Sequence, residues 1–401
     1  MMSKDPAVRL QDFQVFGEYG DVNPSISDAA TYTFLSVEKM QQLFSEEVEG
    51  CFLYSRHMSP MNHYLTQALA AIEGTEDANV MASGMGAIST CLLQLCGCGD
   101  EIISSRTIYG GTYALLKNFF PKLGINTHFV NITKLDEVQS KINDKTKVIY
   151  CETISNPLLE IADIRELRKI ADERGIKLVV DNTFSPLVVP AYELGAHIVV
   201  YSLTKFINGT NDCVAGAVCG PHDFIASMRN VNDGAAMLLG PVLDSFRSAS
   251  ILKNLRTLHI RMKKHSENAM FIASELEKAG VKVFYPGLPS HPQHELIKSM
   301  INPQYGYSGM ITIDAKDAET AGNLMICMQE AKVGYFAVSL GFYKTLFSSP
   351  GSSTSSEIPK EEQEAMGMTP GLVRFSMGLD NDIQDTLERI LGCMKKVDLL
   401  K

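Results

Sequence analysis

Two short, nearly all-apolar segments lie close together in the middle of this chain, at residues 177–180 and 197–201. Strands that are buried on both faces of a parallel sheet have this composition, because helices cover both sides of the sheet. Before them, residues 163–174 follow a helical period in which Ile164 and Leu167 share one face. This alternation predicts an α/β fold with a mostly parallel sheet.

The same alternation divides the chain into parts. Strands are expected at residues 101–105, 127–132, 148–153, 177–180 and 197–201, and helices at 63–73, 84–95, 111–120 and 163–174. Farther on, we expect one or two long helices over 242–276, strands at 281–285, 309–314 and 372–377, and a helix at 317–331. We therefore predict an N-terminal arm over 1–60 with one short helix, an α/β domain over 61–255, and a smaller C-terminal α+β domain over 256–401.

Charge and composition argue against several classes of protein. The 401 residues carry a formal net charge of −10, which disfavours a nucleic acid or an anionic membrane as partner, because both require a basic face. The first residues lack the apolar core of a secretory signal, and no apolar run approaches the roughly 20 residues that span a bilayer. The nine cysteines show no paired zinc spacing. We therefore expect reduced thiols, no metal site and a cytoplasmic location.

Each of the two apolar segments is followed by residues that can act together in chemistry. Asp181 ends the first segment, and Lys205 follows the second beside Ser202 and Thr204. Alone, the aspartate could be a helix cap and the lysine a solvated charge. Together, a partly buried lysine, a carboxylate at a neighbouring strand end and two hydroxyls predict a site for pyridoxal 5′-phosphate (PLP). The lysine would form the Schiff base, the aspartate would keep the pyridinium nitrogen protonated, and the hydroxyls would bind the phosphate.

Four further features suit the same cofactor, although each has an ordinary structural explanation when taken alone. Residues 83–86 (Ser-Gly-Met-Gly) precede a helix whose first N–H groups could bind a phosphate, but they form neither a Walker loop nor G-x-G-x-x-G. Tyr109 could stack on a planar ring or act as an acid or base. Tyr54 and Arg56 could clamp a phosphate. Arg374 lies in an apolar segment and requires an anionic partner, either a substrate carboxylate or a structural acid.

In this order along the chain, these motifs resemble the trans-sulfuration family of PLP enzymes, also called the Cys/Met metabolism family. The matching segments are Gly20-Asp-Val-Asn-Pro24, Tyr54-Ser-Arg56, Glu73-Gly74, Ser83-Gly-Met-Gly-Ala87, Tyr109-Gly-Gly-Thr112, Glu152-Thr-Ile-Ser-Asn156-Pro157, Asp181-Asn-Thr-Phe184, Ser202-Leu-Thr-Lys205, Ser339-Leu-Gly341 and Arg374-Phe-Ser-Met-Gly378. The resemblance covers nearly the whole chain and implies a fold-type-I, PLP-dependent transferase-like fold. It also implies a homotetramer of two active dimers, in which the N-terminal arm contacts the neighbouring subunit.

The resemblance implies a role for each residue. Lys205 would be the Schiff-base lysine, Asp181 the pyridinium partner, and Tyr109 a catalytic residue stacked on the ring. The other cofactor contacts would be Gly84, Met85, Ser202 and Thr204 at the phosphate, Asn156 at the ring hydroxyl, Tyr54 and Arg56 at the phosphate of the neighbouring subunit, and Thr183. The contacts to a small amino-acid substrate would be Ser339, Arg374, Val338 and Tyr54.

The residue before Ser339 bears on the substrate. The resemblance implies carbon–sulfur cleavage of a sulfur amino acid, and Val338 is typical of the methionine γ-lyase branch, because an apolar wall suits a thioether methyl. Methanethiol, ammonia and 2-oxobutanoate would then be the products. Members that process cystathionine tend to carry a glutamate at this position.

Three departures from the methionine γ-lyase pattern leave alternatives open. Gly111 replaces a cysteine, Gly209-Thr210 replaces Gly-His, and a serine-rich stretch over 348–356 replaces Met-Thr-His. Cystathionine γ-lyase, cystathionine γ-synthase and O-acylhomoserine sulfhydrylase are therefore the alternatives within the family. Outside it, the alternatives are a nicotinamide-dependent oxidoreductase, which the missing G-x-G-x-x-G disfavours, and a non-catalytic binding protein.

Overall fold

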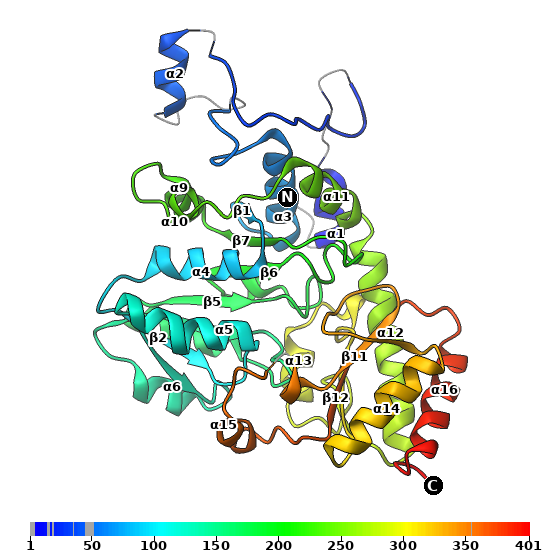
Figure 1. Ribbon diagram of the computed structural model, residues 1–401. Helices are drawn as coiled ribbons and strands as arrows, with labels where there is room; N and C mark the ends of the chain where they lie inside the picture. The colour runs from blue at the N-terminus through cyan, green and yellow to red at the C-terminus, as the bar shows by residue number, and fades with distance from the viewer. Residues whose placement is uncertain (1–4, 14–16, 18–19, 35, 45–51, 354) are drawn as a thin grey trace.

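The computed structural model describes residues 5–13, 17, 20–34, 36–44, 52–353 and 355–401. Two sheets organise them, a seven-stranded sheet built from residues 77–220 and a five-stranded sheet built from residues 282–376. Figure 1 shows the two sheets side by side, with α2 (Val37–Phe44) projecting away from the body of the molecule. In these ranges no helix is long and apolar enough to cross a membrane.

The large sheet is mostly parallel. Its strands are β1 (Asp77–Met81), β2 (Glu101–Ser105), β3 (Asn126–Val130), β4 (Thr146–Glu152), β5 (Lys177–Asp181), β6 (Ile198–Ser202) and β7 (Gly216–Gly220), in the order β1-β7-β6-β5-β4-β2-β3. The strands from β6 to β3 are parallel, and β7 runs antiparallel between β1 and β6. The predicted α/β fold is thus confirmed, and the carboxyl ends of β4, β5 and β6 meet at one edge of the sheet.

The parallel strands are buried on both faces, as their composition predicts. In β4, Ile149 and Cys151 belong to one core cluster, and Val148 and Tyr150 belong to a second cluster on the opposite face. The first cluster includes residues of α3 (Pro60–Glu73), α6 (Leu135–Lys141), α7 (Ile164–Arg174), α8 (Ala191–Leu194) and α11 (Ser245–Leu255). The second includes residues of α4 (Gly84–Leu95), α5 (Gly110–Ala114), α9 (His222–Arg229) and α10 (Ala235–Leu239).

The C-terminal part builds a smaller α+β unit around its own core. Its strands are β8 (Lys282–Phe284), β9 (Met310–Asp314), β10 (Gly334–Phe336), β11 (Thr345–Ser348) and β12 (Leu372–Ser376), in the order β10-β11-β12-β9-β8. Its helices are α12 (Leu258–Lys278), α13 (His294–Met300), α14 (Ala318–Glu330), α15 (Lys360–Ala365) and α16 (Ile383–Lys396), with 3-10 turns at Pro303–Tyr305 and Pro350–Ser352. The exact domain boundaries stay a prediction.

Several predicted elements differ from the structure. The helix expected over 111–120 ends early: α5 passes into a π-helical turn at Leu115–Phe119 and a 3-10 turn at Phe120–Leu123. Pro121 explains the change, because proline lacks the N–H of a regular helical turn and its ring clashes with the preceding turn. The arm contains two described helices, α1 (Pro6–Asp12) and α2, where one was expected. The strands β1, β7, β10 and β11 were not among the predicted strands.

Candidate active site

A cavity of about 520 Å³ opens at the carboxyl edge of the large sheet, where the small sheet approaches it. It brings together most of the residues that the sequence singled out, namely Gly84, Met85, Tyr109, Asn156, Asp181, Thr183, Ser202, Thr204, Lys205, Val338, Ser339 and Arg374. Strand ends supply Asp181 and Ser202, helix α4 supplies Gly84 and Met85, and the C-terminal unit supplies Ser339 and Arg374. In the part of the chain that the structure describes, no cluster of three His, Cys, Asp or Glu residues could hold a metal ion.

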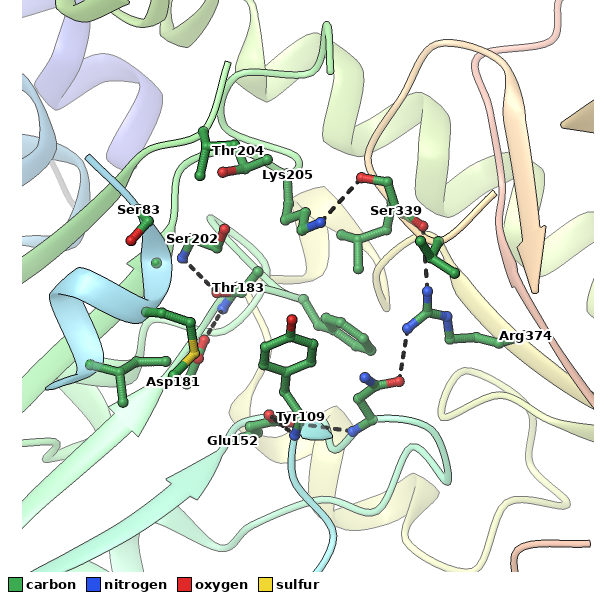
Figure 2. Close-up of a pocket in the computed structure, with 18 of the residues that line it drawn as sticks. Ser83, Tyr109, Glu152, Asp181, Thr183, Ser202, Thr204, Lys205, Ser339 and Arg374 are labelled. Atoms are coloured by element: carbon green, nitrogen blue, oxygen red, sulfur yellow. Dashed lines mark hydrogen bonds between the residues drawn. The ribbon is translucent and has the colours of Figure 1, made fainter. Parts of the chain in front are cut away.

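Lys205 lies in the turn after β6 and points into the cavity (Figure 2). Its Nζ donates a hydrogen bond to Ser339 Oγ at 3.1 Å. Burial, together with the positive charge of Arg374, lowers the pKa of Lys205 to about 8. At pH 7, about a tenth of the amine is therefore unprotonated and able to act as a nucleophile or a base, far more than for an ordinary lysine.

Asp181 ends β5 and is buried beneath the cavity. Its Oδ1 accepts a hydrogen bond from Thr183 N at 2.9 Å, and its Oδ2 accepts one from Tyr150 OH at 3.3 Å. Burial raises the pKa of Asp181 above the usual value, although the hydrogen bonds from Thr183 act in the opposite direction. A cation bound next to this carboxyl would favour its ionised form.

Glu152 ends the neighbouring strand β4, lines the cavity and is buried, with 7% of its surface exposed. Its Oε1 accepts a hydrogen bond from Tyr109 N at 2.7 Å, and its Oε2 accepts one from Asn156 N at 2.9 Å. Burial, and then the nearby Asp181 carboxylate, raise the pKa of Glu152 to about 8. This carboxyl therefore fixes the backbone of two cavity residues and limits the total negative charge beneath the cavity.

The start of α4 forms a close-fitting cradle against β6. Ser83 caps the helix, and its Oγ accepts a hydrogen bond from Gly86 N at 2.8 Å. A Cβ atom at Gly84 would lie 2.8 Å from Ser202 Cβ, so only glycine fits there. The first N–H groups of a helix have no partner within the helix and carry its positive dipole end. The cradle can therefore hold an anion such as a phosphate.

Arg374 supplies a buried positive charge from β12. It is 3% exposed, and its two Nη atoms donate to Asn156 Oδ1 at 2.8 Å and to Ser339 O at 3.4 Å. Burial lowers the pKa of Arg374 to about 10, so the guanidinium stays charged at neutral pH. Both recorded partners are neutral oxygens, which leaves the charge available to a carboxylate that enters the cavity.

Tyr109 stands at the centre of the cavity, and its ring lies between Asp181 and Arg374 in Figure 2. It is 41% exposed. Burial, and then the negative charge of Glu357, raise the pKa of the Tyr109 phenol. The phenol therefore keeps its proton at neutral pH and can donate it to a departing group.

Tyr54 and Arg56 do not line this cavity in the part of the chain that is described. Arg56 Nη1 donates to Met237 O at 3.0 Å, and its guanidinium lies 5.8 Å from the centre of the Tyr54 ring. Tyr54 is 42% exposed. Their predicted role, contact with the phosphate of a neighbouring subunit, stays a prediction.

Sequence reasoning did not assign a role to three residues of this region. Glu152 had a usable signal, because it ends an apolar strand as Asp181 does. Glu357 and Asn211 had none, because they lie on loops. The loop that carries Glu357 is held by α15, where Glu362 Oε2 accepts a hydrogen bond from Tyr113 OH at 2.7 Å.

The chain as a whole is similar to known proteins. The family model for the Cys/Met metabolism PLP-dependent enzymes matches residues 9–394. A methionine gamma-lyase of Arabidopsis thaliana is 44% identical over 93% of this chain and 86% of its own length. A cystathionine gamma-lyase of Dictyostelium discoideum is 35% identical over 86% of this chain and 87% of its own.

A solved structure from Campylobacter jejuni shares the fold. It is provisionally described as an O-acetylhomoserine (thiol)-lyase and carries a pyridoxyl-lysine phosphate at its position 205. It covers 98% of this chain and 100% of its own length, with 28% sequence identity and a TM-score of 0.90. Three activities are thus represented among similar chains.

Proposed function

Because the chain belongs to the Cys/Met metabolism PLP-dependent enzyme family, we propose that it cleaves the Cγ–S bond of L-methionine. The reaction takes up one water and releases methanethiol, ammonia and 2-oxobutanoate. Family membership confirms the resemblance seen in the sequence motifs and makes PLP the cofactor. The choice of methionine is carried by one observation: Val338 presents an apolar side chain to the cavity beside Ser339 and is 59% exposed.

The residues of the cavity fit PLP. The cradle at Gly84 suits the phosphate, because it offers the first N–H groups of α4 and has no space for a side chain at residue 84. We assign Ser202 and Thr204 to the same phosphate, Asp181 to the pyridinium nitrogen, and Lys205 to the covalent attachment. When bound, PLP accepts the electron pairs that remain after protons leave substrate Cα and Cβ. A pyridinium cation beside Asp181 would also lower the raised pKa of that carboxyl.

We assign Arg374 to the substrate carboxylate. Its fork of N–H donors matches a carboxylate, and Asn156 Oδ1 holds one end of the fork at 2.8 Å. With the carboxylate fixed there, the substrate side chain extends toward Val338. A methyl thioether buries apolar surface against the valine and leaves no polar group unpaired.

Two groups move protons in this proposal. Lys205, with its pKa of about 8, takes protons from Cα and Cβ once the substrate amine has taken its place. Burial raises the pKa of the Tyr109 phenol. The phenol therefore keeps its proton until the thiolate departs and then donates it to the thiolate. The negative charge of Glu357 raises the pKa of Tyr109 further, because it disfavours a phenolate nearby.

We further propose that a second copy of the chain completes the site. A neighbouring cavity of about 690 Å³ shares Thr204, Val214 and Ser339 with the first. Val214 and Val242 both line this second cavity and are 57% and 36% exposed. Exposed apolar side chains at the mouth of a polar site suit a subunit contact. Tyr54 and Arg56 of the second copy would then reach the phosphate, as the family resemblance implies.

Cystathionine is the second candidate substrate, and Glu357 favours it. This carboxylate lines the cavity and could pair with the distal ammonium of cystathionine. Methionine has no such ammonium. Cystathionine would therefore gain an ion pair from the Glu357 carboxylate, whereas methionine would gain nothing from it.

One assay separates the candidates. The purified enzyme with PLP is given methionine, cystathionine, homocysteine and O-acetylhomoserine separately, and the thiol and keto-acid products are identified. We expect methanethiol and 2-oxobutanoate from methionine at the highest kcat/KM. A higher kcat/KM on cystathionine would overturn the choice of methionine. Borohydride reduction and peptide mapping would place the cofactor, and a label on a lysine other than Lys205 would overturn the site.

A further inference from the structure

The loop after Lys205 departs from the usual family sequence at Gly209-Thr210, and it brings Asn211 against the site. Ser339 Oγ donates a hydrogen bond to Asn211 Oδ1 at 3.0 Å. The same Ser339 Oγ accepts one from Lys205 Nζ at 3.1 Å. A hydroxyl has one proton and two lone pairs, so donation to Asn211 leaves a lone pair free for the lysine.

We propose that Asn211 is a positioning residue for the Lys205 amine, because its side-chain oxygen accepts the Ser339 hydroxyl and so turns a lone pair of Ser339 toward Lys205 Nζ. This inference rests on the proposed function, in which Lys205 carries the cofactor. Asn211 itself does not contact substrate or cofactor in this account; it acts through Ser339.

The loop holds Asn211 in a defined conformation. Asn211 has φ +54°, in the left-handed region that asparagine tolerates better than most residues. The next residue, Asp212, accepts hydrogen bonds at Oδ1 from Asn208 Nδ2 at 2.8 Å and from Thr210 Oγ1 at 2.7 Å. Asn254 Nδ2 in turn donates to Asn208 Oδ1 at 2.9 Å. These bonds fix the backbone on both sides of Asn211 and hence the direction of its side chain.

The orientation of Ser339 affects the protonation of Lys205. A charged amine donates a stronger hydrogen bond than a neutral one, so an accepting Ser339 favours the charged form. Without Asn211, the Ser339 hydroxyl could instead donate to the neutral amine and favour that form. The other titratable or charged groups around the amine are Arg374, Tyr109, Asp181, Glu152 and Glu357 in the same cavity, and Asp212, Cys213, Asp244 and Arg247 in the neighbouring one. Changing Asn211 to a neutral residue leaves all of them in place.

The test follows the capture of PLP by the full-length apoenzyme. The rate of covalent capture is measured by visible absorbance over a range of pH, and borohydride mapping confirms Lys205 as the attachment site. The wild-type profile should have its midpoint near 8, where Lys205 loses its proton. Asn211→Gly keeps the left-handed backbone and removes the amide. We expect its midpoint to fall by about half a pH unit, roughly a threefold change in the equilibrium constant.

Three controls show whether the effect passes through Ser339. Asn211→Asp keeps an acceptor, so its midpoint should lie at or above that of the wild type. Thr210→Val removes one bond of the loop and keeps the Asn211 amide, so its midpoint should move less than that of Asn211→Gly. In a Ser339→Ala background, Asn211→Gly should have no further effect.

The possible results separate this inference from the proposed function. A wild-type label on another lysine would overturn the proposed function itself. A wild-type label on Lys205, with an unchanged midpoint in Asn211→Gly, would overturn the inference alone. An equal shift in Thr210→Val, or a shift that persists in the Ser339→Ala background, would also overturn it.

Discussion

Glu152 and Asp181 stand opposite each other in register at the carboxyl ends of the adjacent parallel strands β4 and β5. Both carboxyls are buried, at 7% exposure each, and they lie beneath the same cavity. Burial, and then the like charge of Asp181, raise the pKa of Glu152 to about 8. Near neutral pH, Glu152 therefore keeps its proton in most molecules, and a cation bound beside Asp181 would favour the ionised form of Asp181.

We predict that Asp181→Asn removes most of the turnover on methionine. Asparagine keeps the shape of the side chain but cannot hold the proton on the pyridinium nitrogen. The expected loss of kcat is on the order of a hundredfold or more, with PLP binding only weakened. The exposed Asp172→Asn on α7 is the matched control. Turnover of Asp181→Asn within a few-fold of the wild type would rule out the role assigned to this carboxyl.

The fold was predictable where burial alone decides the sequence. β5 and β6 are read correctly because a strand covered on both faces has to be apolar along its length. β7 has the same length as β5 and β6, but Gly216–Gly220 begins and ends with glycine, which weakens the strand signal, and it was missed. The helix expected over 111–120 failed at its end because Pro121 changes the turn geometry.

The site was predictable where chemistry follows directly on such a strand. Lys205 and Asp181 each follow an apolar segment, and the sheet then brings them together at its carboxyl edge. Glu357 and Asn211 could not be found in this way. Glu357 reaches the cavity only because α15 docks on Tyr113, and Asn211 depends on a left-handed backbone and a bond to a residue 128 positions away. Such contacts leave no periodic mark in the sequence.

We predict that Arg56→Ala and Lys205→Ala subunits complement each other when mixed. Each variant alone should be nearly inactive. In a hybrid dimer, one site combines the intact Lys205 of one chain with the intact Arg56 of the other. Random mixing at equal amounts should therefore restore about a quarter of the wild-type activity, since half of the dimers are hybrids with one intact site.

A second mixture provides the control for this experiment. It combines Lys205→Ala with Asp181→Asn subunits. Lys205 and Asp181 line the same cavity of one chain, so each of the two sites in this hybrid lacks one of them. If the first mixture stays inactive although hybrids are confirmed by mass, each site is built from a single chain.

We predict that Glu73→Gln flattens the pH dependence of stability. Glu73 is buried at the end of α3, where Tyr201 OH and Tyr192 N donate to it. Burial raises its pKa from 4.5 to about 7, so the folded chain binds an extra proton between these values. Stability from this group is complete below pH 4.5 and is lost as the pH rises through 7, by up to about 3 kcal/mol.

The measurement is Tm as a function of pH, with the exposed Glu173→Gln as control. The wild type and the control should lose more Tm between pH 5 and 8 than Glu73→Gln does. Parallel curves for the wild type and Glu73→Gln would mean that Glu73 does not titrate in this window.

We predict that Glu357→Gln widens the substrate range toward acidic side chains. The Glu357 carboxylate lines the cavity and should repel the distal carboxylate of O-succinylhomoserine. Its removal should raise kcat/KM on that compound by about threefold to tenfold at low salt and less at high salt, with methionine little changed. Glu361→Gln on α15 serves as control, because it removes the same negative charge at a residue that does not line the cavity. An equal gain in both variants would show that net charge, not the cavity wall, sets the preference.

We predict that Val338→Glu moves the preference from methionine to cystathionine. The valine offers an apolar wall to a methyl thioether and cannot pair with a distal ammonium. When methionine binds, a glutamate at this position would lose solvent without gaining a partner, whereas the ammonium of cystathionine would pair with it. The ratio of kcat/KM values for the two substrates should therefore change on the order of tenfold or more.

Val338→Gln separates the charge of the new side chain from its size. It fills the same space as glutamate, so a change that depends on the ion pair should appear in Val338→Glu and be small in Val338→Gln. Val338 lies beside Ser339, whose carbonyl accepts from Arg374. Both variants should therefore keep an unchanged inhibition constant for 2-aminobutanoate, which has the α-amine and carboxylate of the substrate but no thioether. If the two variants shift the preference equally, the residue at position 338 acts through the size of its side chain. The lack of charge on Val338 would then not explain a preference for methionine.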